Sequence, residues 1–149
     1  MKYDYFIAGR WRNHQEIRKL IKVLRESNKK VYCFVDNAYN SDGIIIDNNP
    51  NADVENFMSK LESVEDWRNN PTFQKIYEND MNGLRNSETF IVVFPAGLSA
   101  HMELGAAYGM GKKCFGIGTP EKNETLYLMF EEIFPNISSF FEAKIGVAV

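Results

Sequence analysis

The chain has 149 residues, of which 44% are hydrophobic, 25% charged and 13% aromatic, a composition typical of one globular domain and unlike that of disordered or fibrous chains. The formal net charge of -3 gives no general reason to bind nucleic acid or an anionic membrane, so an anion would have to be held by local groups. No apolar run approaches the roughly 18 residues that span a bilayer, and the N-terminus shows no secretory signal pattern, so we expect a cytoplasmic protein.

Four short apolar runs predict strands buried on both faces, because the runs are continuous instead of alternating. They cover residues 5–8, 31–35, 90–94 and 114–117. Between the first two runs, four apolar residues at helical spacing predict a core-facing helix: Ile17, Leu20, Ile21 and Leu24. Asn13, with Glu16 three residues later, predicts a capping box at the start of that helix.

Two more helices are predicted over residues 72–86 and 99–110, on either side of the third strand. The connection over residues 37–70 is long and rich in Asn, Asp and Ser, and it contains a short amphipathic pattern from Val54 to Leu61. We expect it to be a structured flap, either a surface excursion or a lid over a site. The C-terminal part predicts a helix over 124–132, a Pro-Asn break and a last element that is helix or edge strand.

The alternation of strands and helices predicts a single α/β domain over residues 1–149. We expect a flavodoxin-like or Rossmann-like sandwich, with a central, mostly parallel sheet of four or five strands and helices on both faces. Ligands of such sheets bind outside the carboxyl ends of the strands. Cys33 and Cys114 lie inside apolar runs and are expected to be buried; two isolated cysteines form neither a zinc site nor a disulfide framework, and we expect no metal or cofactor.

Each helix beside the third strand carries one acidic residue in its predicted core-facing stripe. The first stripe is Phe73, Ile76, Tyr77, Asp80, Met81 and Leu84, and the second is Ser99, Met102, Glu103, Ala106, Ala107 and Met110. A lone buried carboxylate costs several kcal/mol unless it is paired, hydrogen-bonded or protonated. Taken singly, Glu103 could be favoured by the helix dipole and Asp80 could reach solvent. As a pair they predict a shared polar site near the carboxyl end of the strand.

The turn before the second of these helices offers ligand-binding groups. Gly97 lets the backbone approach a ligand closely, and Ser99 with the first amides of the helix can donate to an anion or to sugar hydroxyls. His101 lies off the stripe, which favours a surface or supporting role over a catalytic one. Five small residues are expected to let this helix pack close to the sheet: Gly105, Ala106, Ala107, Gly109 and Gly111.

The loop after the first strand contains one glycine and two arginines. Gly9 alone is not a complete phosphate-binding fingerprint. Arg10 and Arg12 next to a helix N-terminus are suited to a phosphate, although two exposed loop arginines are an equal alternative. Trp11 and Tyr39 could stack on a base, although large aromatic residues at such positions are more often partly buried packing.

Three stretches resemble the nucleoside 2-deoxyribosyltransferase family, which includes the related (deoxy)nucleoside 5'-monophosphate N-glycosidases. They are "YFIAGRWRN", "IYENDMNGLRNSETFIVVFPAG" and "SAHMELGAAYGMGKKCFGIG". The match covers the start of the chain and about residues 76–118. The sequence departs from the family pattern at "GLSAHMELG". This stretch lacks the Asp-Gly-rich segment that is expected before the helix in the transferases.

The resemblance implies an enzyme that cleaves the N-glycosidic bond of a nucleoside or nucleotide, as part of nucleotide metabolism. Glu103 then corresponds to the nucleophile that forms a glycosyl ester, and Asp80 to the carboxyl group that handles the proton of the leaving base. Arg10, Arg12 and Ser99 resemble the phosphate-gripping positions of the monophosphate-cleaving branch. The resemblance also implies a homo-oligomer with a small-molecule partner.

Other classes stay open. A TIR-like NAD glycohydrolase also uses a helix glutamate in such a sheet, and a nucleotide sensor would bind without releasing base. The sugar could pass to water, as in a hydrolase, or to another base, as in a transferase. The sequence does not show which nucleobase or which sugar the substrate contains.

Overall fold

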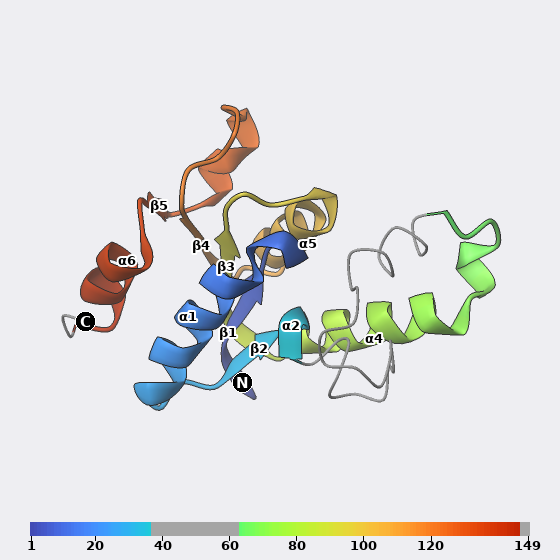
Figure 1. Cartoon of the computed structure of the whole chain (residues 1–149), viewed down its shortest axis with the longest axis horizontal. Coiled ribbons are helices and arrows are strands. Elements are labelled where there is room, and N and C mark those ends of the chain that lie inside the picture. Colours follow the sequence, from blue (N-terminus) through green and yellow to red (C-terminus); the bar gives the residue numbers. More distant parts are fainter. Residues whose placement is uncertain (37–62, 147–149) are drawn as a thin grey trace.

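A computed structural model of the chain describes residues 1–36 and 63–146, which form a five-stranded sheet with helices on both faces (Figure 1). The strand order is β2-β1-β3-β4-β5, and all four neighbouring pairs are parallel. The strands are β1 (Tyr3–Ala8), β2 (Val31–Cys33), β3 (Ser87–Val93), β4 (Lys113–Ile117) and β5 (Glu132–Phe134). The predicted α/β sandwich with a parallel sheet is therefore confirmed.

In the described residues, four longer helices pack against the sheet along all or part of their length: α1 (His14–Glu26), α4 (Pro71–Arg85), α5 (Leu98–Gly109) and α6 (Ile137–Lys144). The short elements are η1 (Trp11–Asn13), α2 (Phe34–Asp36), η3 (Trp67–Asn69) and η4 (Thr125–Met129). Successive residues of β1 point to opposite faces, so Ile7 joins the core under α1 and α6, whereas Phe6 joins the core under α4 and α5. None of the helices in the described part of the chain has the length and apolar character needed to span a bilayer.

The start of α1 differs from the sequence prediction. The four predicted core residues of this helix are buried, as expected. Asn13, however, has no capping hydrogen bond, because its φ of -98° and ψ of 18° lie outside the extended region that an N-cap adopts. The predicted capping box with Glu16 is therefore wrong. Asn13 instead donates from Nδ2 to the carbonyl oxygen of Phe94 at 3.1 Å, which ties the loop after β1 to the end of β3.

The C-terminal segment corrects a second prediction. A helix over 124–132 does not form: the five residues of η4 are a 3-10 turn, and β5 follows as an edge strand. Pairing of Glu132 with Phe115 and of Phe134 with Ile117 satisfies the open side of β4, which outweighs local helix preference. The last element is the helix α6, and a capping box between Asn136 and Ser139 starts it.

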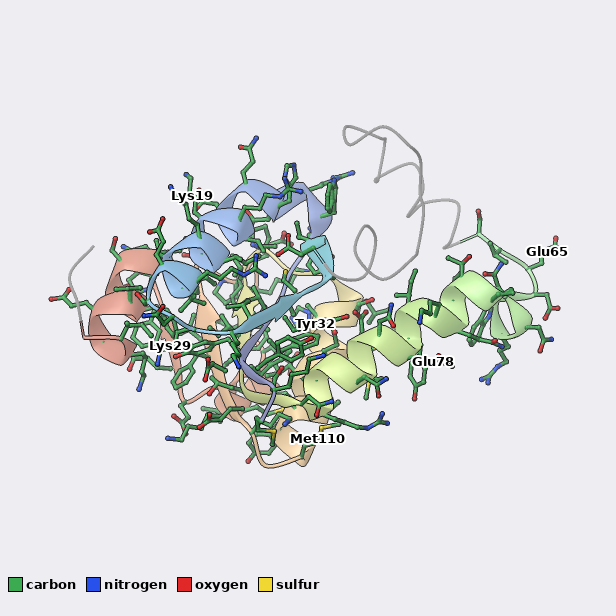
Figure 2. All side chains as sticks on the ribbon, turned by 90° about the horizontal axis from the view of Figure 1, so that it is seen from below. Lys19, Lys29, Tyr32, Glu65, Glu78 and Met110 are labelled. Atoms are coloured by element: carbon green, nitrogen blue, oxygen red, sulfur yellow. The ribbon has the colours of Figure 1, made fainter. Side chains whose placement is uncertain are left out.

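Only the C-terminal end of α4 packs against the sheet. Gly83 and Leu84 are buried, whereas Tyr77 of the predicted core-facing stripe is 63% exposed. Figure 1 and Figure 2 show the helix extending away from the body of the molecule, with Tyr32 at its foot and Glu78 further along it. The predicted stripe is therefore a core face only toward its C-terminal end, where Leu84 is buried and Met81 packs against the core. The amphipathic pattern from Val54 to Leu61, and most of the predicted flap, lie outside the described residues.

Candidate active site

Glu103 lies on the core-facing side of α5, one turn into the helix. Its neighbours on that side are Ala100, Leu104 and Ala107, which are buried. The stripe predicted from the sequence was shifted, because Ser99, Met102 and Met110 are exposed. The reason is that α5 is apolar around its whole circumference, so apolar periodicity does not fix which face turns inward. Glu103 was correctly placed on the inner side, and it is half-buried.

Burial raises the pKa of the Glu103 carboxyl well above its usual range, and the negative charge of Asp80 raises it further. Desolvation acts on any carboxyl group in this position, whereas the second cause requires Asp80 to be close. The two acidic residues that the sequence predicted as a pair therefore lie within electrostatic reach of each other.

Asp80 accepts a hydrogen bond from the hydroxyl of Tyr32, with 3.0 Å between Oη and Oδ1. Tyr32 comes from β2 and is buried, and its ring stacks on Phe6 with centroids 5.1 Å apart. Sequence analysis missed Tyr32, because a tyrosine inside a short apolar run does not show which way its hydroxyl points. Its only signal was a polar atom in a strand predicted to be buried on both faces.

The carboxyl end of β2 lies within electrostatic reach of this pair. Burial raises the pKa of the Cys33 thiol, the backbone amide of Val35 partly offsets this, and the charges of Asp36, Glu103 and Asp80 raise the pKa again. Cys33 and Cys114 are both free and buried, as predicted. A buried thiol with a raised pKa is a poor nucleophile. Cys33 is therefore not a candidate nucleophile at this edge of the sheet.

The loop after β1 and the loop after β3 lie side by side. A Cβ at Gly97 would meet Nε of Arg10 at 3.5 Å, and Nη1 of Arg10 lies 3.6 Å from Oε1 of Glu121. Gly9 is required by packing, since a Cβ there would lie 2.9 Å from Cδ1 of Ile17 and 3.1 Å from the carbonyl oxygen of Val93. The predicted phosphate-binding groups on these loops are exposed to solvent: Arg10, Arg12 and Ser99.

His101 uses both ring nitrogens within the chain. Nδ1 lies 2.7 Å from the carbonyl oxygen of Gly97, and Nε2 lies 2.8 Å from the hydroxyl of Tyr127. Because a carbonyl only accepts, Nδ1 donates to Gly97, and the hydroxyl of Tyr127 is the partner of Nε2. The ring therefore ties η4 to the start of α5, which agrees with the supporting role expected for His101 better than with direct substrate binding.

The other residues predicted to bind substrate differ in their surroundings. The ring of Trp11 is packed within the chain, because it stacks on the ring of His14 with centroids 4.8 Å apart. Tyr39 lies outside the described residues. The prediction that the glycines of α5 let the helix pack close to the sheet is wrong, because a Cβ at Gly105 or Gly109 would meet nothing within 4 Å. No group of three or more His, Cys, Asp or Glu side chains in residues 1–36 and 63–146 could hold a metal ion.

The fold and the site define a class: a parallel α/β sheet with one acidic side chain, Asp80 or Glu103, on each of the two helices that precede and follow its central strand. No protein-family model and no curated protein matches the sequence. Among solved structures, the chain is similar to a 2-deoxyribosyltransferase from Bacillus psychrosaccharolyticus, described as a biocatalyst for the synthesis of antiviral and antitumoral nucleosides. The TM-score is 0.59 at 14% identity, over 92% of this chain and 89% of that one. At this identity the similarity establishes a shared fold.

Proposed function

We propose that the protein cleaves the N-glycosidic bond of a nucleoside or (deoxy)nucleoside 5'-monophosphate. The observation that carries the proposal is the half-buried Glu103 on the inner side of α5, with the charge of Asp80 on α4 within electrostatic reach of it. A nucleobase is a poor leaving group until it is protonated, and the cationic sugar that develops is stabilised by a carboxylate. A pair that shares one proton supplies both requirements. The fold shared with a 2-deoxyribosyltransferase supports the same chemistry.

The reaction proceeds in two displacements. A carboxylate oxygen of Glu103 bonds to C1' of the sugar while the C1'–N bond breaks, and its electron pair stays on the base nitrogen. The proton held by the pair passes through Asp80 to the leaving base. Water, or the nitrogen of a second base, then attacks C1' and releases Glu103 as a carboxylate, and the proton lost by this nucleophile returns to Asp80. Capture by water gives a hydrolase, and capture by a base gives a transferase.

A 5'-monophosphate is the favoured substrate. Arg10 is exposed in the loop after β1, and it lies against Gly97 at the start of α5, where helix amides also favour an anion. Its contact with Glu121 is an exposed ion pair at 3.6 Å, which a phosphate would outcompete at little cost. Arg10→Ala should therefore raise the KM for a 5'-monophosphate and leave that for the nucleoside unchanged. Arg68→Ala, on the distant η3, is the control.

The activity test is a panel of nucleosides, 5'-monophosphates and NAD, with and without an acceptor base, followed by chromatography of the free base. We expect base release that is abolished in Glu103→Gln and strongly reduced in Asp80→Asn. Glu78→Gln is the matched control, because Glu78 is an exposed carboxylate on the same helix as Asp80. Release from NAD alone would indicate a NAD glycohydrolase, and binding without release would indicate a sensor. Either result contradicts the proposal.

We also propose that the protein acts as a homo-oligomer. Support comes from the outward face of α5, which carries no charge and displays Leu98, 78% exposed, and Met102, 66% exposed. Gly105 and Gly109 on the same face leave open space for a neighbouring helix. Because the face is apolar along its length, a second copy related by a two-fold axis would complement it. Sedimentation should give a species heavier than 17.2 kDa that Met102→Lys dissociates.

The matched control for this face is Leu128→Lys on η4, because Leu128 is 90% exposed and lies outside α5. This variant should sediment like the wild type. A wild-type chain that sediments as a monomer at high concentration would contradict the oligomer but leave the proposed chemistry standing.

A further inference from the structure

Tyr32 is a buried polar group that the proposed chemistry does not yet use. It is 3% exposed and lies in β2, whereas the residue its hydroxyl contacts, Asp80, lies in α4. The 3.0 Å hydrogen bond therefore joins two residues that are 48 positions apart in the chain. Figure 2 shows Tyr32 where α4 meets the sheet.

The ring of Tyr32 has little freedom to move. It is stacked on Phe6 at 5.1 Å between centroids and meets Tyr3 edge-on at 5.5 Å. On the side of α4, Gly83 leaves only enough room for the ring, since a Cβ there would lie 2.7 Å from two of the ring carbons. A hydroxyl on a ring held in this way has a fixed position, so it can fix the orientation of the carboxyl that it contacts.

We propose that Tyr32 is a positioning residue that orients Asp80 and stabilises its carboxyl in the ionised form. The inference rests on the proposed function in treating these two carboxyls as the reacting pair. A phenol that donates to Oδ1 stabilises the ionised form of Asp80 more than the protonated form.

Other titratable side chains surround the two carboxyls. Glu103 has a raised pKa because of burial and because of the charge on Asp80. Cys33 on β2 stays protonated, since burial raises the pKa of its thiol, and Asp36 on α2 forms an ion pair with Arg25, with 2.9 Å between Nη1 and Oδ2. The charged side chains of α4 next to Asp80, such as Glu78, are exposed.

Tyr32→Phe tests this role, because it removes the hydroxyl and keeps the ring contacts. The first measurement is a titration of the carboxyl carbons by NMR, with the Asp80 signal assigned from Asp80→Asn. Loss of a hydrogen bond to a charged group should move the Asp80 step to higher pH by about one pH unit. Tyr3→Phe, whose ring touches Tyr32, is the control and should leave the step unchanged.

The second measurement is the pH dependence of base release. In Tyr32→Phe the acid limb should move to higher pH by the same amount as the Asp80 step, with the alkaline limb unchanged. A merely structural role would lower the rate at every pH without moving the limb. An Asp80 step that does not move in Tyr32→Phe overturns the inference. If the wild type releases no base, the proposed function fails, and the carboxyl titration still decides the role of Tyr32.

Discussion

Replacing Gly83 with alanine should destabilise the protein, although alanine is the better helix former. The helix-interior position of Gly83 favours alanine by about 0.8–1 kcal/mol. Against this, the new methyl group would lie 2.7 Å from two ring carbons of Tyr32 and 2.8 Å from a third. The ring is stacked on Phe6 and does not retreat freely. Overpacking costs about 1–3 kcal/mol, and a ring that is itself packed places this case in the upper part of that range, at about 2–3 kcal/mol, so we expect a net loss of about 1–2 kcal/mol.

Gly105→Ala is the matched control, because a Cβ at Gly105 would meet nothing within 4 Å. This variant should gain about 0.5–1 kcal/mol. Thermal unfolding by circular dichroism, at one dilute protein concentration, should lower the Tm of Gly83→Ala by about 2–8 °C and raise that of Gly105→Ala by about 1–4 °C. A Gly83→Ala protein that melts at or above the wild-type temperature would refute the close contact between α4 and β2.

Three further predictions concern the pKa of Glu103 and the hydrogen bond of Asn13. Base release should be bell-shaped in pH, with its alkaline limb above the usual range of a glutamate, because the pair loses its last proton through the raised pKa of Glu103. The stability contributed by this carboxyl is present below its ordinary pKa and is lost as pH rises through the raised one. Glu103→Gln should therefore raise Tm, and by more at pH 8 than at pH 5; an equal gain at both would contradict the burial argument. Asn13→Ala should cost about 0.5–1.5 kcal/mol in urea unfolding, because it removes the 3.1 Å bond to Phe94.

The sheet and α1 could be predicted because their signals are local. The four strand runs are continuous and apolar, and both faces of those strands are covered. In α1, four apolar residues alternate with charged ones at helical spacing, so one face is unambiguous: Ile17, Leu20, Ile21 and Leu24. The prediction of a capping box was wrong because η1 continues directly into α1. No sequence pattern shows that the Asn13 side chain donates its hydrogen bond to the carbonyl oxygen of Phe94 instead.

β5 and the register of α5 could not be predicted, for two different physical reasons. β5 has three residues and forms because β4 offers it an unpaired edge, which is a property of the assembled sheet. In α5 the outward residues Leu98 and Met102 are as apolar as the inward Leu104, so the sequence contains no contrast from which to choose a face.

The sequence predicted the acidic residues of the candidate site but not the tyrosines whose hydroxyls form hydrogen bonds around it. Asp80 and Glu103 stood out because charge interrupts an apolar pattern on two helices beside one strand. Tyr32 and Tyr127 did not, because a tyrosine is common in partly apolar segments and the partner of its hydroxyl is set only by the tertiary fold.

The most direct test of the central claim is mass spectrometry of the protein, acid-quenched during turnover of a slowly cleaved nucleotide. If Glu103 is the nucleophile, the intact protein should gain the mass of the sugar, or of the sugar phosphate, and proteolysis should locate it on the peptide that contains Glu103. Glu103→Gln should carry no adduct, whereas Glu78→Gln should carry as much as the wild type. Base release without any adduct, or an adduct on another residue, would contradict the assignment of Glu103 as the group that attacks the sugar.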